Sequence, residues 1–130
     1  GVTESWTHRK IGDAEIDIEG YSVFRKDRDF DTGRKKRGGG VLLYTRNDLK
    51  AYEIDNSDYK CESIFVCIKI QGLGDLRVGV CYRSPNVGRE DFEDLSKVIR
   101  KHTENAAIIM GDFNYPHIDW INVNSMDKSS

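Results

Sequence analysis

One stretch constrains the fold of this chain more than any other. Residues 106–110 form an unbroken apolar run that ends in Gly111-Asp112-Phe113-Asn114. A run this short, with polar residues on both sides, is typical of a strand buried on both faces of a sheet. Such a strand would place Asp112 and Asn114 at the carboxyl end of a sheet, where α/β and sandwich enzymes keep their sites. Because Gly, Asp and Asn are also turn residues, an ordinary Asx turn explains the tetrapeptide equally well.

The patterns elsewhere predict an α/β chain in which consecutive strands form hairpins. Residues 62–70 and 76–82 both alternate between apolar and other side chains, and the Gly-rich segment between them predicts an antiparallel hairpin. Shorter strands are expected at 21–25, 41–45 and 49–54.

Residues 89–102 show helical spacing, with one stripe made of Phe92, Leu95, Val98, Ile99 and His102. Basic residues close this segment, as the helix dipole favours, so His102 is interpreted as a helix residue and not as a ligand.

The composition is that of one domain with a core of its own. The chain has 130 residues, 38% of them hydrophobic and 32% charged. It shows no apolar run long enough to span a membrane and no signal peptide, so an intracellular protein without membrane contact is expected.

The cysteines, Cys61, Cys67 and Cys81, form no C-x-x-C pair. Buried, reduced thiols are therefore favoured over a disulfide or a zinc site.

Charge is concentrated in one block. The net charge is only −2, yet residues 25–37 hold seven cations against three acids, directly before a triple glycine. A solvated loop explains this block; the sharper alternative is an arm that contacts phosphates. The four adjacent cations of that arm would be Arg34, Lys35, Lys36 and Arg37.

Four separated motifs now stand in a recognisable order. They are Thr3-Glu4-Ser5-Trp6, Arg37-Gly38-Gly39-Gly40-Val41, Tyr82-Arg83-Ser84-Pro85-Asn86 and Gly111-Asp112-Phe113-Asn114, the last followed by Ile118-Asp119-Trp120. Together they resemble the endonuclease/exonuclease/phosphatase superfamily, and within it the apurinic-type endonuclease domain of non-LTR retrotransposons. The resemblance implies a partial four-layered α/β sandwich of the DNase I-like kind, mostly antiparallel with covering helices, over residues 1–121. Residues 122–130 are expected to form a loose polar tail.

The resemblance also implies roles for single residues. Glu4 would match the metal-binding glutamate, and its carboxylate suits Mg²⁺, with Mn²⁺ as the alternative ion. Asp112 would orient or deprotonate the attacking water. Asn114 would hold a phosphate oxygen or the water beside it, and Tyr82 would place its phenol on the phosphate. Asn86, Arg83 and the basic run 34–37 would contact DNA. Each residue alone also has a structural explanation: a surface acid for Glu4, an apolar-face residue for Tyr82, a helix cap for Asn86.

Two expected motifs are missing from the sequence. No asparagine motif precedes Glu4, and no Ser-Asp-His follows; His117 is interpreted as a loop residue and not as its substitute. The sequence is therefore expected to be a fragment truncated at both ends, inactive alone and completed by flanking segments of its own polyprotein. The implied function is a nuclear, metal-dependent endonuclease that nicks DNA for target-primed reverse transcription. The alternatives are a phosphoesterase for a lipid or inositol phosphate and a non-catalytic remnant that binds nucleic acid or protein.

Overall fold

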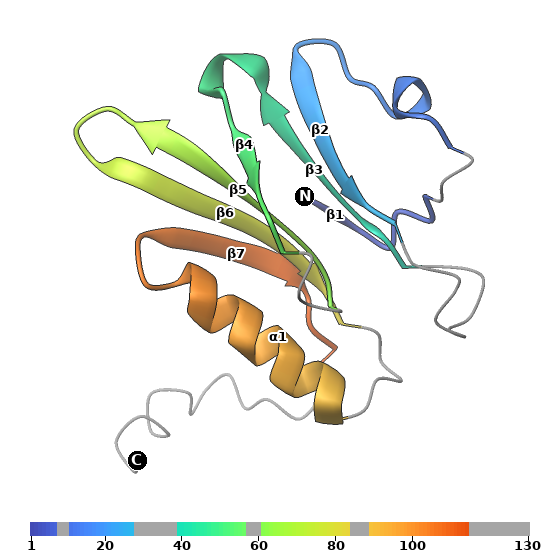
Figure 1. The fold of residues 1–130 in the computed structure, drawn as a ribbon. Helices are drawn as coiled ribbons and strands as arrows, with labels where there is room; N and C mark the ends of the chain where they lie inside the picture. Colours follow the sequence, from blue (N-terminus) through green and yellow to red (C-terminus); the bar gives the residue numbers. More distant parts are fainter. Residues whose placement is uncertain (8–10, 28–38, 57–60, 84–88, 115–130) are drawn as a thin grey trace.

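The computed structural model describes residues 1–7, 11–27, 39–56, 61–83 and 89–114, without the side chains of 89–92. Two sheets pack face to face, and helix α1 covers the outer face of one of them (Figure 1). The three-stranded sheet has the order β1 (Val2–Thr3), β3 (Val41–Arg46), β2 (Tyr21–Lys26). The four-stranded sheet has the order β4 (Tyr52–Ile54), β5 (Glu62–Ile70), β6 (Gly74–Tyr82), β7 (Ala107–Asp112). The helix α1 spans Arg89–His102, and 3₁₀ turns lie at Asp13–Glu15 and Asn47–Leu49.

Successive apolar side chains of β5 and β6 point to opposite faces and build a core on each side of the four-stranded sheet. Strand residues one apart point to opposite faces, so a strand with apolar residues in both sets can be buried twice. The core between the sheets consists of Val41, Leu43, Ile64, Val66, Val80 and Tyr82. The core beneath α1 consists of Cys61, Phe65, Cys81, Leu95 and Val98. Gly79 lies opposite Phe65 in the β5–β6 pair, and a Cβ there would lie 2.3 Å from the Phe65 ring, so glycine makes room for the ring.

Most of the predicted elements are confirmed. The strands at 21–25, 41–45, 62–70 and 76–82 form, as does the helix at 89–102. The α/β class is confirmed as well, and the described residues supply three of the four expected layers: two sheets and one helix. The three cysteines are buried and free, as predicted. The strand predicted at 49–54 is shorter, because a 3₁₀ turn takes Asn47–Leu49 and β4 begins only at Tyr52. The predicted tail, 122–130, lies outside the described residues.

The prediction that residues 106–110 are buried on both faces is wrong. Strand β7 runs from Ala107 through Gly111 to Asp112 and pairs in parallel with β6, with α1 as the crossover. Ile109 packs beneath the helix, whereas Ile108 and Met110 are 53% and 37% exposed. The reason is position, because β7 is an edge strand of its sheet and the three-stranded sheet ends at the two-residue strand β1.

His102 ends α1 and connects it to the sheet. Its ring is fully buried and stacks on Phe65, with ring centroids 3.8 Å apart. Its Nδ1 lies 3.2 Å from Arg77 Nη1, and its Nε2 lies 2.8 Å from Asn56 Oδ1. Because a guanidinium only donates, Nδ1 accepts and Nε2–H donates, so the imidazole is neutral. Burial, assisted by the charges of Arg77 and Lys101, lowers the pKa of His102 from 6.5 to about 4. His102 is thus a structural helix residue, as predicted.

The free energy of unfolding should therefore fall on acidification. Between pH 6.5 and about 4 the unfolded histidine binds a proton and the folded one does not, so stability present above pH 6.5 is lost as the pH drops. The expected loss from pH 7 to pH 4.5 is about 2 kcal/mol from this group. Urea unfolding at several pH values measures it. His102→Gln should be less stable at pH 7 and should show a shallower dependence over this window, and an unchanged slope would contradict the neutral imidazole.

Candidate functional site

The strands of both sheets meet at one end of the sandwich, which we call the rim. Tyr82, the last residue of β6, is aligned with Glu62 at the start of β5 and with Asp112 at the end of β7. Glu62 and Tyr82 share the face that points toward the three-stranded sheet, because Ile64 and Val80 have the same parity and belong to the core between the sheets. Asp112 shares this face too, because Ile109, at the opposite parity on β7, packs beneath α1. The rim of the other sheet is formed by Thr3, which is aligned with Val41. The fold thus brings residues from four strands to one edge.

Glu4 follows β1 directly and faces Tyr82. The Tyr82 hydroxyl donates a hydrogen bond to Glu4 Oε1 at 2.8 Å. The Tyr82 side chain is only 5% exposed and belongs to the core between the sheets, so its ring is held by packing and only its hydroxyl reaches the rim. Glu4 itself has a φ of +50°, a conformation that non-glycine residues rarely adopt. Glu4, Tyr82 and Asp112 are therefore neighbours at the rim, with Tyr82 between the two acids.

Asp112 and Asn114 form the turn that the sequence also allowed. The backbone N–H of Asn114 donates to Asp112 Oδ1 at 3.2 Å, and Asn114 has a φ of +47°. Asn114 Nδ2 donates to the Arg83 carbonyl, while Arg83 Nη1 donates to the Asn114 carbonyl at 3.0 Å. Arg83 N–H also donates to the Asp112 carbonyl at 2.8 Å. Hydrogen bonds thus join the segment after β6 to the segment after β7, and they fix the Asp112–Asn114 turn at the rim.

Sequence reasoning missed Glu62, which is 6% exposed. Its Oε1 accepts the Gly40 N–H at 3.3 Å. In turn the Gly40 carbonyl accepts the Ser5 N–H at 3.2 Å, and the Gly39 carbonyl accepts the Trp6 N–H at 3.0 Å. A buried carboxylate therefore fixes the glycine turn against which residues 4–6 lie. The signal was present in the sequence, because Glu62 has the parity of Ile64 and Val66 and so stands on an otherwise apolar face.

We expect Gly40→Ala to disturb this turn. Gly40 has a φ of +82°, and a Cβ there would lie 2.6 Å from Ser5 Oγ. Gly20→Ala is the matched control, because Gly20 has a φ of +83° with no atom within 4 Å of the added Cβ. Both variants place alanine at a positive φ, which destabilises each of them by a similar amount. The free energy of unfolding in urea should fall by about 1 kcal/mol more for Gly40→Ala, because only its methyl group contacts Ser5. Equal losses would mean that the turn tolerates the extra methyl group.

Several predicted site residues cannot be placed. Asn86, His117 and the basic run Arg34, Lys35, Lys36 and Arg37 lie outside the described residues. Within the described ranges, no group of three or more His, Cys, Asp or Glu side chains is arranged to hold a metal ion. Mg²⁺, however, takes one or two carboxylates and keeps several waters, so an exposed carboxylate at the rim fits it without such a group. Glu4, whose Oε1 is held by Tyr82, is a donor of this kind.

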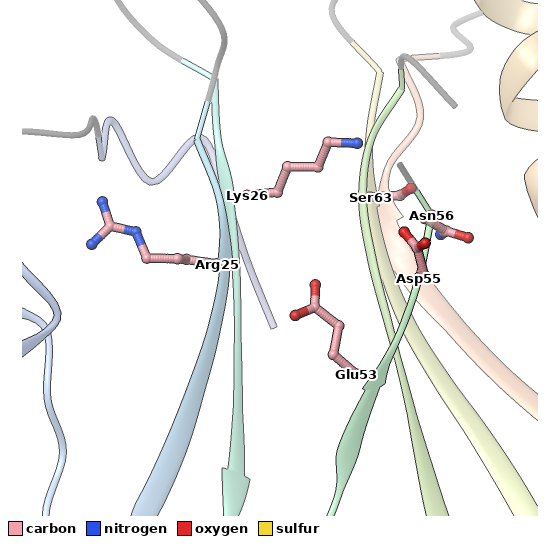
Figure 2. A pocket seen from close by; sticks show the side chains of 6 residues that line it. All are labelled: Arg25, Lys26, Glu53, Asp55, Asn56 and Ser63. Atoms are coloured by element: carbon pink, nitrogen blue, oxygen red, sulfur yellow. The ribbon is translucent and has the colours of Figure 1, made fainter. Parts of the chain in front are cut away.

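A hollow of about 360 Å³ lies between the sheets on the side of β2 and β4. Figure 2 shows Lys26 reaching from β2 toward Ser63 on β5, with Glu53 and Asp55 facing the same gap and Arg25 directed away. Lys26 Nζ donates to the Cys61 carbonyl at 3.0 Å. The lining residues are Arg25, Lys26, Glu53, Asp55, Asn56 and Ser63, so both charge signs are present and none of the rim acids contributes. This hollow is separate from the Glu4–Tyr82–Asp112 site.

Comparison with known proteins gives the arrangement its context. A solved structure, the endonuclease domain of TRAS1, a telomere-specific non-LTR retrotransposon, matches with a TM-score of 0.52 and 19% identity. The match covers 75% of this chain but 42% of that chain, so this chain spans less than half of that domain. At 19% identity the likeness concerns the fold.

No protein of curated function is significantly similar in sequence. Among the helices that the structure describes, none is both long and apolar enough to cross a membrane. The model of the endonuclease/exonuclease/phosphatase family matches residues 2–129, nearly the whole sequence. The chain therefore belongs to the endonuclease/exonuclease/phosphatase family.

Proposed function

We propose that this chain is part of a metal-dependent phosphodiesterase domain that nicks DNA, as in the mobilisation of a non-LTR retrotransposon. The observation that carries the proposal is the contact of the Tyr82 hydroxyl with Glu4 beside the aligned residue Asp112. Phosphodiester hydrolysis needs a cation, a positioned water and groups that hold the phosphate, and two acids with a phenol at one edge can serve these needs. The family and the retrotransposon endonuclease fold agree with this chemistry.

Each group would have one task. Glu4 would hold Mg²⁺, or Mn²⁺ in its place, which supplies positive charge against the phosphate oxygens when bound. Asp112, which is exposed at the end of β7, would orient the attacking water and accept its proton. The Tyr82 hydroxyl donates its one proton to Glu4 here and would redirect it to a phosphate oxygen once Glu4 holds the ion. The Asn114 amide donates to the Arg83 carbonyl and would use its other N–H for a phosphate oxygen. The bonds between Arg83 and Asn114 suggest that Arg83 also positions Asn114, in addition to its proposed contact with DNA.

DNA is the proposed substrate because of charge. The cations Arg34, Lys35, Lys36 and Arg37 stand in one run before the glycine turn that adjoins Glu4. Such a run binds phosphates without reading sequence. We propose a nuclear protein whose flanking polyprotein segments complete the domain, since this chain spans 42% of the matched endonuclease domain.

The test is nicking of supercoiled plasmid, with Mg²⁺ or with EDTA. The 130-residue chain is compared with a version extended at both ends by its natural flanking sequence. We expect Mg²⁺-dependent nicking by the extended protein and much slower nicking by the 130-residue chain. An extended protein that binds the plasmid without nicking it would contradict the proposal and support a non-catalytic binding remnant. Hydrolysis of an inositol phosphate without nicking would support a phosphoesterase.

A further inference from the structure

Trp6 is an exposed indole at the rim. It lies two residues after Glu4, and 58% of its surface is accessible. We propose that Trp6 stacks on an unstacked nucleobase next to the phosphate that binds at Glu4. The inference rests on the proposed function and adds to it the form of the substrate, a strand of DNA whose bases are locally free of the duplex stack.

Exposure alone would not carry this inference, because single exposed hydrophobic residues are common. The backbone distinguishes Trp6. Its φ is +59°, in the left-handed region, which is a genuine outlier for a bulky side chain. Positions of this kind cluster at ligand-binding sites, where the surrounding structure holds them against their conformational cost. Because the Trp6 ring is exposed to solvent, its packing in the folded protein does little to offset the free energy of this backbone conformation.

The surrounding structure does hold Trp6. Its N–H donates to the Gly39 carbonyl at 3.0 Å, and the Ser5 N–H donates to the Gly40 carbonyl at 3.2 Å. Ser5 Oγ lies 2.9 Å from Thr7 Oγ1, which donates to Asp27 Oδ1 at 2.7 Å. The residues on both sides of Trp6 are thus bonded to Gly40, which precedes β3, and to Asp27, which follows β2. A ring carried on such a preorganised turn loses little conformational freedom when it stacks on a ligand.

The short distance along the chain between Glu4 and Trp6 favours a nucleobase as the partner of the indole. Two residues span at most about 7 Å, which is about two nucleotide steps along a DNA strand. An indole so close to Glu4 can reach the bases beside a phosphate held there. Bases inside a duplex present no free face, so the partner is a single strand or a base that has left the stack. Aromatic stacking of this kind tolerates any base, because every base has a π-face.

Two measurements on the 130-residue chain test the proposal, both in Mg²⁺ and with Asp112→Asn in every protein, so that Glu4 can hold the ion while cleavage is suppressed. Trp120→Phe leaves Trp6 as the one indole, whose fluorescence is followed with a 12-nucleotide oligothymidylate and with a blunt duplex of equal length. We expect the single strand, at saturation, to quench Trp6 and protect it from acrylamide more than the duplex does. By fluorescence anisotropy, Trp6→Ala should weaken single-strand binding about 5- to 100-fold. Trp6→Phe should retain most of the affinity, and Trp6→Leu should resemble Trp6→Ala.

Tyr21→Ala is the matched control, because Tyr21 is an exposed aromatic residue at the opposite end of the three-stranded sheet. Its affinity should be unchanged. Circular dichroism melts identify any variant that fails to fold. The comparison of Trp6→Phe with Trp6→Leu then shows whether binding needs an aromatic ring or only a large apolar side chain. Wild-type affinity in a folded Trp6→Ala, or an indole that the bound strand leaves unquenched, would overturn the stacking proposal while plasmid nicking still stands as the test of function. Failure of the folded chain to bind any nucleic acid would also overturn the stacking proposal, and plasmid nicking by the extended protein would then decide the function separately.

Discussion

Asp112→Asn should lower the rate of Mg²⁺-dependent plasmid nicking by about 100- to 10,000-fold, which is the usual worth of a general base. The assay uses the chain extended by its flanking sequence. The substitution is chosen for its geometry: Asn retains an Oδ1 that can accept the Asn114 N–H, which lies 3.2 Å from Asp112 Oδ1 in the turn. The turn should therefore persist while the proton acceptor is lost. Unfolding curves of the two proteins should superimpose.

Asp75→Asn is the matched control for this change. Asp75 is an exposed aspartate on β6, the strand beside β7, and it is aligned with Lys69 at the end of the sheet away from the rim. It should nick at the wild-type rate. If Asp112→Asn loses less than tenfold, Asp112 only shapes the turn, and the ordinary Asx turn is then the correct explanation of the Gly-Asp-Phe-Asn motif.

The sequence predicted those parts of the fold that depend on local pattern. The alternation at 62–70 and 76–82 located β5 and β6, because a period of two is specific to strands with two distinct faces. The helical stripe located α1 from its first to its last residue. Burial of 106–110 was wrongly predicted, since whether a face is covered depends on the extent of the opposite sheet and not on the strand itself. Ile108 and Met110 remain exposed for that reason.

The sequence predicted which residues form the site but not the contacts that hold them in place. Motif order pointed to Glu4, Tyr82 and Asp112, and the strand ends bring these residues to one rim. The contacts that hold them come from register and from turns. Glu62 supports the glycine turn, and Arg83 is bonded to Asn114 across the ends of two strands. No periodicity predicts such bonds, because they join residues that are distant in sequence and meet only after the sheets have packed.

Gly111→Ala should be the most destabilising single-methyl change at the rim. Gly111 is aligned with Cys81 in the parallel β6–β7 pair, and a Cβ at Gly111 would lie 1.9 Å from the Cys81 carbonyl oxygen. That neighbour is backbone, so no side-chain rotation can relieve the contact and the strands must separate locally. We expect a loss of about 3 kcal/mol or more in the free energy of unfolding by urea.

Gly12→Ala is the control, because Gly12 has a φ of −74° and no atom within 4 Å of the added methyl group. It should stay within about 0.5 kcal/mol of wild type. A Gly111→Ala protein of equal stability would mean that β6 and β7 do not approach as closely as the structure has them. Because Tyr82 and Asp112 are aligned one residue beyond this contact, folded Gly111→Ala should also nick more slowly than Gly12→Ala. The glycine before Asp112 is thus required by strand packing, and the position of the proposed base depends on that packing.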